Sequence, residues 1–174
     1  VQLMLSPTAR TIQGFCNLIE REWVSFGYPF ASNCGHYCHL DISDTNSSVK
    51  KDIQNISPLF LQFLEAIWQL LQNFPQHFDF NEELLVTITL ASYEGLFTNF
   101  IGNSEKDRNN KKIPSHSIWN YIFSNLSRYQ NPFYRPTNQP LLPRLNVSHM
   151  KVWESFYRRW DRLSPHRVQV AIEN

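Results

Sequence analysis

The chain has 174 residues, of which 42% are hydrophobic and 14% aromatic, so it has enough apolar side chains to bury a core and is not compositionally disordered. Sixteen basic and fifteen acidic residues give a net charge of +1, which does not indicate nucleic acid as a partner. No segment is apolar over the about 18 residues that a membrane span needs, and three cysteines do not form a disulfide framework. We therefore expect a reducing, cytoplasmic compartment.

The first predicted helix begins after Ser6 and Pro7, which supply an N-cap and a proline at the first helical position. Apolar residues then recur at steps of three or four: Ile12, Phe15, Ile19, Trp23 and Phe26. This spacing places them on the buried face of an amphipathic helix. Gly27 follows, where a left-handed glycine commonly ends a helix. We predict one continuous helix, with Cys16 on its buried face as a structural cysteine.

The middle of the chain alternates between a polar loop and apolar helices. Residues 33–56 are polar and predict a surface loop. A second serine–proline pair at 57–58 and apolar residues at helical spacing predict a helix that ends before Pro75. Asn81 predicts the start of another helix, because two acidic residues follow it, although the run at 86–89 would suit a strand equally well.

The C-terminal third begins with the charged residues 103–112, which we expect to face solvent. Residues 118–126 have the apolar spacing of another helix, which we expect to end near Asn131 and Pro132. Four prolines argue against regular structure in the loop at residues 131–145: Pro132, Pro136, Pro140 and Pro143. Apolar residues at helical spacing predict the last helix: Met150, Trp153, Tyr157 and Trp160. Residues 1–174 therefore indicate a mainly α-helical part of a single domain.

The cysteines lack the motif of cysteine-dependent phosphatases, in which a Cys-x5-Arg loop supplies the nucleophilic thiolate and an arginine that holds the phosphoryl oxygens. The sixth residue after each cysteine is not arginine: Glu22 after Cys16, Leu40 after Cys34 and Asp44 after Cys38. The Cys and His residues at 34–39 could share a zinc ion, but no second cluster follows them. We expect no metal, no other cofactor and no catalytic residue in this chain.

Three arginines lie close to Trp160 near the end of the chain: Arg158, Arg159 and Arg162. They could meet anionic lipid headgroups, because each cation near such a surface adds a little affinity. The interpretation that we favour is the solvated flank of a helix whose core stripe includes Trp160, because three charges add little membrane affinity. The sequence leaves both interpretations open.

Three stretches, in the same order, resemble a known family. The first reads R-T-I-x-G-F-x-x-L-I-x-x-E-W-x-x-x-G at residues 10–27, and the others lie at 57–69 and 74–82. With shorter matches continuing to Trp160, the chain resembles the part of myotubularin-related phosphoinositide phosphatases that follows their catalytic loop. The resemblance implies a helical C-terminal portion of an α/β domain, whose central sheet and Cys-x5-Arg loop would lie before Val1.

The turn after the first helix departs from the family pattern. Active myotubularins usually read W-x-S-F-G-H-R-F-x-x-R there, and the two arginines face the phosphoinositide headgroup, because a planar guanidinium holds phosphate in a bidentate fork. In this chain Tyr28 stands in place of the histidine, and Pro29 and Asn33 stand in place of the two arginines. Neither Pro29 nor Asn33 supplies a cation, so the substrate-binding residues stay unassigned.

Other residues most resemble the catalytically inactive adapters of the family: Val1-Gln2-Leu3-Met4-Leu5, Gly27-Tyr28-x-Phe30, Cys34-x-His36 and Trp153…Tyr157-x-Arg159-Trp160. That resemblance implies a pseudophosphatase that pairs with an active myotubularin in a hetero-oligomer. It would lie peripherally on endosomal membranes and influence the turnover of phosphatidylinositol 3-phosphate and 3,5-bisphosphate. The alternative is an active phosphoinositide 3-phosphatase whose Cys-x5-Arg loop lies upstream, so the sequence leaves enzymatic activity open.

Overall fold

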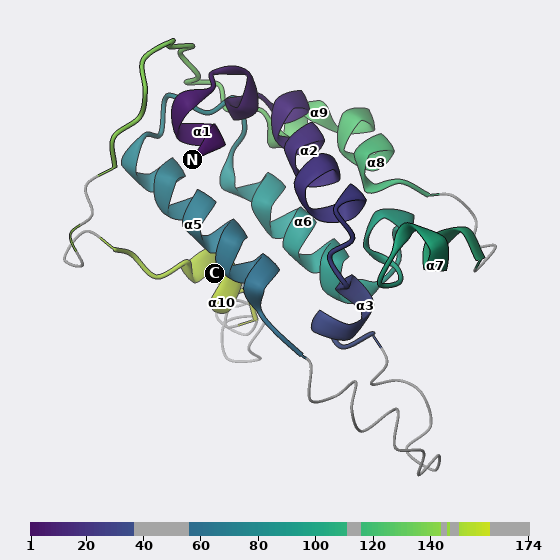
Figure 1. Cartoon of the computed structure of the whole chain (residues 1–174). Helices are drawn as coiled ribbons and strands as arrows, with labels where there is room; N and C mark the ends of the chain where they lie inside the picture. The colour runs from purple at the N-terminus through teal and green to yellow at the C-terminus, as the bar shows by residue number, and fades with distance from the viewer. Residues whose placement is uncertain (37–55, 111–115, 144–145, 147–149, 161–174) are drawn as a thin grey trace, which may run out of the picture. The chain divides into compact units, whose positions relative to one another are not determined.

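The computed structural model describes residues 1–36, 56–110, 116–143, 146 and 150–160 (Figure 1). Two compact units, Val1–Pro143 and Arg144–Asn174, are described separately. Throughout the described residues the regular elements are helical, and the one β-bridge among them pairs Phe80 with Gln130. The prediction of a mainly α-helical chain is therefore confirmed. Among these residues no helix is both long enough and apolar enough to cross a membrane.

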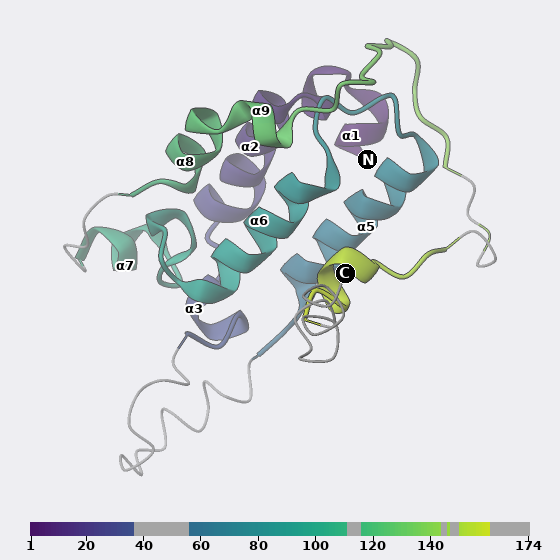
Figure 2. The same cartoon turned by 180° about the vertical axis from the view of Figure 1, so that it is seen from behind.

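The N-terminal unit contains, in chain order, α1 (Gln2–Leu5), the 3-10 helix η1 (Thr8–Arg10), α2 (Ile12–Ile19), the π-helix η2 (Glu20–Ser25), α3 (Phe30–Asn33), α5 (Leu59–Asn73), α6 (Glu82–Glu94), the 3-10 helix η4 (Thr98–Phe100), α7 (Glu105–Asn110), α8 (Ile118–Ser124) and α9 (Leu126–Tyr129). Both views show α6 between α5 and the pair of α8 and α9 (Figures 1 and 2). The helix α6 is therefore the central element of this unit.

The first long helix begins at Ile12, so the predicted start at Ser6 and Pro7 is wrong. Thr11 has an extended backbone, with φ −84° and ψ 156°, and its hydroxyl oxygen caps α2 by accepting from the Gly14 N–H at 3.0 Å. The Arg10 carbonyl accepts from the Asp79 N–H at 2.9 Å instead of from a helical turn. This tertiary hydrogen bond separates η1 from α2 at a point where the local sequence favours a continuous helix.

The same helix changes its winding before it ends. From Glu20 to Ser25 the backbone is π-helical, so the prediction of one regular α-helix up to Phe26 is wrong in its second half. The Glu20 carboxylate accepts from the side chains of Asn99 at 2.9 Å and Trp119 at 2.7 Å. Gly27 then ends the helix with φ +84°, as predicted. Short π-helical insertions often occur at functional sites, which draws attention to the following turn.

The later helices follow the sequence signals closely. The helix α5 covers the predicted apolar run, although Pro58 rather than Ser57 occupies its N-cap position. The helix α6 begins at the Asn81 cap, whose side chain accepts from the Glu83 N–H at 3.0 Å, and it includes residues 86–89, so the strand alternative is wrong. The predicted helix at 118–126 is interrupted at Asn125, which separates α8 from α9.

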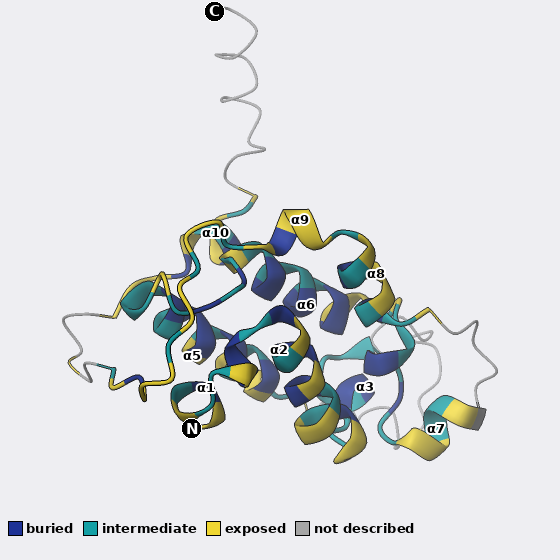
Figure 3. Ribbon diagram, turned by 90° about the horizontal axis from the view of Figure 1, so that it is seen from above, coloured by how far each residue is buried: buried dark blue, intermediate teal, exposed yellow. Residues whose placement is uncertain are grey.

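An aromatic core joins these helices. Six phenylalanines are almost fully buried: Phe15, Phe30, Phe60, Phe78, Phe80 and Phe100. Phe15 of α2 stacks on Phe80 with their ring centroids 4.7 Å apart, and it lies 6.4 Å from Phe63 of α5. Figure 3 shows that buried residues gather on α2, α5 and α6, whereas the residues of α7 are largely intermediate or exposed.

The described part of the C-terminal unit contains one short helix, α10 (Glu154–Tyr157). Trp153 and Phe156 pack against each other with their ring centroids 5.0 Å apart. Met150 precedes the helix and Trp160 follows it, and both are exposed, so the predicted helical stripe from Met150 to Trp160 is wrong at both ends. Helical spacing alone did not predict how short this helix is.

Candidate functional site

The turn between η2 and α3 carries the residues that the sequence singled out. Gly27 reverses the chain with its left-handed conformation, and the Tyr28 N–H donates back to the Trp23 carbonyl at 2.9 Å. The Phe30 N–H then donates to the Tyr28 carbonyl at 2.9 Å and starts α3. Tyr28 and Pro29 therefore lie in this turn, and Asn33 is the last residue of α3, so the predicted start of the loop at Asn33 is wrong.

Tyr28 packs into an aromatic cluster that consists of Trp23, Tyr28, Phe30, Phe60 and Phe63. Its ring meets those of Trp23 and Phe30 edge-on, with centroids 4.9 and 4.8 Å apart. Burial raises the pKa of the Tyr28 phenol above its ordinary value, and the nearby Asn33 side chain lowers it by less. The Tyr28 hydroxyl is buried and has no hydrogen-bond partner among the described residues. The phenol of Tyr28 and the amide of Asn33 thus face each other at the edge of the aromatic cluster.

Pro29 and Asn33 occupy the two ends of α3, one helical turn apart. The Asn33 N–H donates to the Pro29 carbonyl at 2.9 Å, and the Asn33 carbonyl accepts from the Ser57 N–H at 3.1 Å. Proline has no N–H, and the asparagine amide carries no charge. The turn itself therefore presents no cationic side chain for a phosphate group.

A clip formed by Gly102 and Asn103 holds this turn from the other side. The Asn103 side chain accepts from the Ser32 N–H at 2.9 Å and donates to the Ser32 hydroxyl at 2.8 Å. The Gly102 carbonyl accepts from the Ala31 N–H at 3.2 Å. Asn103 lies in the segment 103–112, which was predicted to face solvent, so its contact with α3 was not predicted.

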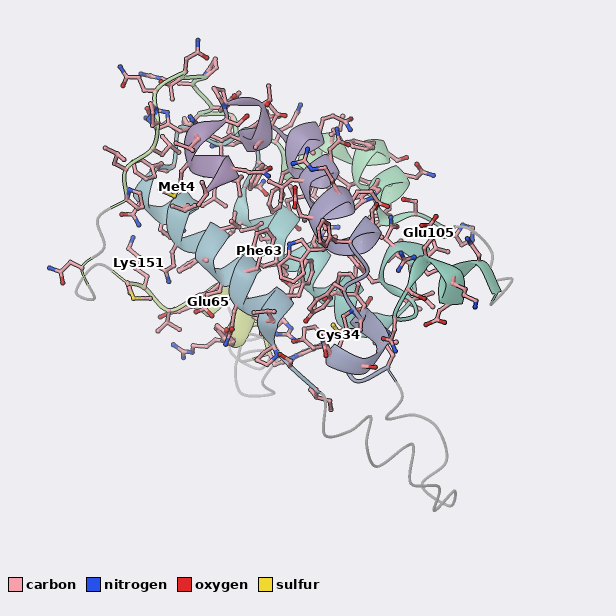
Figure 4. The ribbon with its side chains drawn as sticks, viewed as in Figure 1. Met4, Cys34, Phe63, Glu65, Glu105 and Lys151 are labelled. Carbon is pink, nitrogen blue, oxygen red and sulfur yellow. The ribbon has the colours of Figure 1, made fainter. Side chains whose placement is uncertain are left out.

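Arg108 of α7 brings a guanidinium group to the C-terminal end of η2. Its Nη2 donates to the Val24 carbonyl at 3.0 Å, directly before the turn. Its Nη1 is buried and has no hydrogen-bond partner among the described residues. Residues 103–112 were expected to face solvent, and this holds for Glu105 and Lys106 but is wrong for Arg108. Figure 4 labels Glu105 on α7 and Cys34 beside α3.

The two described cysteines are protonated thiols at neutral pH. Burial raises the pKa of Cys16 to about 12 and that of Cys34 to about 11, and Cys16 is 2% exposed, which confirms it as a buried residue of α2. A nucleophilic cysteine needs a lowered pKa, which these sites do not provide. Cys38 lies outside the described residues.

The suggested metal cluster at residues 34–39 is only partly described. His36 directs its Nε2 to the Ser92 carbonyl at 2.7 Å, near the C-terminal end of α6. Where the chain is described, no three His, Cys, Asp or Glu side chains come together in a way that could hold a metal ion. Cys38 and His39 lie outside the described residues, so the interpretation of this loop stays a prediction.

Arg10 is a buried cation that the sequence did not single out beyond its place in the motif. Its side chain is 1% exposed and donates to four backbone carbonyl groups: Leu3 at 2.9 Å, Thr137 at 3.1 Å, Gln139 at 3.0 Å and Met4 at 3.4 Å. The Leu141 N–H also donates to the Met4 carbonyl at 2.8 Å. Arg10 therefore fixes the proline-rich segment against the N-terminal residues of the same unit.

Comparison with known proteins gives a consistent result. A family model described as the myotubularin-like phosphatase domain matches residues 1–109. The chain is 36% identical to myotubularin-related protein 9 of Bos taurus over 171 residues, and 38% identical to myotubularin of Xenopus tropicalis over 162 residues. It is 40% identical to the phosphatidylinositol-3,5-bisphosphate 3-phosphatase MTMR2 of Bos taurus over 167 residues.

These alignments cover most of this chain but a small part of each relative. They include 95%, 91% and 94% of the chain, respectively, and 29%, 25% and 24% of the relatives' own lengths. The chain therefore spans about a quarter of the length of these proteins.

Proposed function

The chain belongs to the myotubularin-related phosphatase family, and from that premise we propose that its protein is a pseudophosphatase. In this proposal the protein is a regulatory adapter that binds an active myotubularin in a hetero-oligomer. Through that partner it would influence the turnover of phosphatidylinositol 3-phosphate and 3,5-bisphosphate. It would act in the cytoplasm, peripherally on endosomal membranes.

The turn at Tyr28, Pro29 and Asn33 is the observation that carries the proposal. By the family resemblance, the last two positions usually hold arginines that face the headgroup. Here Pro29 is the N-cap of α3, and the Asn33 N–H at the end of α3 donates to the Pro29 carbonyl at 2.9 Å, so the turn is built from packing and neutral backbone hydrogen bonds. A pocket formed on this turn would lack two cations.

The loss is large on the scale of phosphate binding. A hydrogen bond to a charged group contributes about 1.5–3 kcal/mol, so two missing arginines would cost roughly 3–6 kcal/mol of headgroup affinity. That corresponds to a weakening of roughly 100-fold to 10,000-fold. An enzyme with this turn would need other cations to bind its substrate.

The alternative function is an active phosphoinositide 3-phosphatase with its Cys-x5-Arg loop outside residues 1–174. Arg108 is the observation that favours it, because its guanidinium reaches the end of η2 with one buried Nη1 that bonds to no described residue. However, its Nη2 is engaged by the Val24 carbonyl, and one arginine does not replace two. We therefore retain the adapter as the leading proposal.

The deciding experiment uses the full-length protein and vesicles that contain phosphatidylinositol 3-phosphate. Released phosphate is measured for the protein alone, for MTMR2 alone and for both together. The adapter proposal expects no release by the protein alone and a change in the rate of MTMR2 when both are present, with co-purification of the two proteins. Phosphate release by the protein alone would overturn the proposal and establish the alternative.

A variant that restores the family arginines distinguishes a protein that lacks the catalytic nucleophile from one that lacks only the arginines for the headgroup. In Pro29→Arg/Asn33→Arg, the adapter proposal expects tighter binding of the headgroup without hydrolysis, because the nucleophile is absent. If the variant gains phosphatase activity, the protein holds an intact catalytic loop and the adapter proposal fails. The single variants Pro29→Arg and Asn33→Arg serve as controls, because each adds one cation and should give an intermediate affinity.

A further inference from the structure

The charges of this chain are unevenly distributed between its two units. Residues 144–174 contain six Lys or Arg and three Asp or Glu, whereas residues 1–143 contain ten and twelve. The C-terminal unit therefore has a net charge of +3 and the N-terminal unit a net charge of −2. The overall charge of +1, which does not indicate nucleic acid as a partner, conceals a basic unit in the C-terminal part of the chain.

Exposed apolar side chains follow one another closely in the described segment of the same unit. Within the described segment at 150–160, four of them face solvent: Met150 (67% exposed), Val152 (66%), Tyr157 (45%) and Trp160 (65%). Single exposed apolar residues are ordinary, but four in one short segment form a candidate interaction surface. Their exposure also argues against the interpretation that Trp160 belongs to a core stripe.

Basic side chains lie among these apolar ones. The Arg159 guanidinium lies over the rings of Phe156 and Trp160, 4.5 and 5.3 Å from their centroids, and its Nη1 donates to the Phe156 carbonyl at 2.7 Å. A cation is thus fixed beside the exposed indole. Lys151 is also exposed (Figure 4), as is Arg158, whose Nη1 lies 4.0 Å from a Glu154 carboxylate oxygen.

We propose that this basic and aromatic segment, residues 150–160, docks on anionic lipid membranes. Trp and Tyr rings favour the headgroup level of a bilayer, where Lys and Arg meet anionic headgroups. A lipid surface also adapts its shape, so it accepts apolar side chains that project from a short segment without forming a groove. This docking requires only residues of the C-terminal unit and is independent of the adapter proposal.

The docking is expected to be weak and reversible. Each cation close to an anionic membrane contributes a factor of about five to the partition coefficient, and the segment offers Lys151, Arg158 and Arg159. The burial of Trp160 adds a further factor of at least about five. Such a surface would orient a peripheral protein that other contacts also hold at the membrane.

The test is co-sedimentation of the full-length protein with vesicles of phosphatidylcholine, with or without phosphatidylserine and free of phosphoinositides. Lys151→Ala/Arg158→Ala removes two cations from the segment, and Arg21→Ala/Lys106→Ala removes two exposed cations from the N-terminal unit. We expect the first pair to lower the partition coefficient on phosphatidylserine vesicles by roughly 25-fold and the control pair by less than about twofold. Trp160→Ala should lower it by at least about fivefold.

The controls make each outcome decisive. All four residues of the two double variants are exposed, so both proteins should keep the wild-type melting temperature. Binding to phosphatidylserine vesicles should fall when the salt concentration rises from about 0.05 to about 0.3 M, because counterions screen exposed charges. The proposal fails if both double variants lose the same affinity, if neither loses any, or if sedimentation occurs only after a phosphoinositide is added.

Discussion

Replacing Gly14 by alanine tests how closely η1 approaches α2. A Cβ atom on Gly14 would lie 1.8 Å from the Thr8 carbonyl oxygen, 2.7 Å from the Thr8 carbonyl carbon and 3.0 Å from the Thr11 Oγ1. The first two atoms belong to the backbone, so no side-chain rotation relieves the clash. The carbonyl has to withdraw by roughly 1.5 Å before it reaches ordinary contact with the new methyl group.

The cost follows from what that movement breaks. The Thr11 hydroxyl donates to the Thr8 carbonyl at 2.8 Å while it accepts from the Gly14 N–H at 3.0 Å, so the displacement disturbs the cap of α2. A lost cap costs about 1 kcal/mol and overpacking about 1–3 kcal/mol. The better helix propensity of alanine returns about 1 kcal/mol. The expected net loss in the free energy of unfolding is about 2 kcal/mol.

The assay is urea unfolding of the full-length protein, followed by tryptophan fluorescence. With a typical slope for urea, a loss of this size lowers the unfolding midpoint by about 1 M. Gln13→Ala, at an exposed neighbouring position, should leave it unchanged. Gly27→Ala has open space around its Cβ and should cost about 1–2 kcal/mol through its left-handed backbone alone. A Gly14→Ala protein as stable as the wild type would show that the close approach is not rigid.

Three more predictions follow from the buried polar groups. Arg10→Met leaves the carbonyls of Leu3, Thr137 and Gln139 without their donor, whereas the Met4 carbonyl keeps the Leu141 N–H. The variant should therefore cost at least about 3 kcal/mol in urea unfolding, and a loss below about 1 kcal/mol would contradict the role assigned to Arg10. Because folding raises the thiol pKa of Cys16 to about 12 and of Cys34 to about 11 from 9.0, stability should decline as pH rises above about 9. Iodoacetamide at pH 8 should alkylate Cys16 and Cys34 much more slowly in the native than in the urea-unfolded protein, as peptide mass spectrometry would measure. Glu20→Gln removes the charged acceptor of the Asn99 and Trp119 side chains, so it should lower the free energy of unfolding by about 1.5–3 kcal/mol. It should also change the tryptophan fluorescence emission, whereas the exposed control Glu22→Gln should not.

The sequence predicted the helix boundaries that depend on interactions between residues close together in the chain. Apolar spacing and a nearby proline were sufficient for α5, because this helix buries one face. The Asn81 cap was sufficient for the start of α6, because its side chain satisfies an N–H donor of the first turn. The position of Gly27 likewise predicted a left-handed helix end. In each case the decisive interaction spans only a few residues along the chain.

Interactions between distant residues account for the parts that were not predicted. The start of α2 depends on Asp79, which binds the Arg10 carbonyl and lies far along the chain. The clip on α3 depends on Asn103, and Arg108 meets the Val24 carbonyl across a similar separation. Nothing in the spacing of charged residues at 103–112 distinguishes the arginine that turns inward from its exposed neighbours.

The turn at Tyr28, Pro29 and Asn33 is understood only when the sequence and the structure are considered together. The sequence shows that Pro29 and Asn33 lack positive charge, and the structure adds that Asn33 faces a buried phenol within an aromatic cluster. Two arginines in a phosphate pocket repel each other until an anion binds, whereas a proline and an asparagine place no such strain on α3. On the adapter proposal the protein does not have to bind substrate, so a proline and an asparagine can stabilise this turn. The variant Pro29→Arg/Asn33→Arg should therefore lower the free energy of unfolding. Added phosphate should then stabilise that variant more than the wild type, because only the variant would hold paired cations, and an equal response of both proteins would contradict the assignment of this turn.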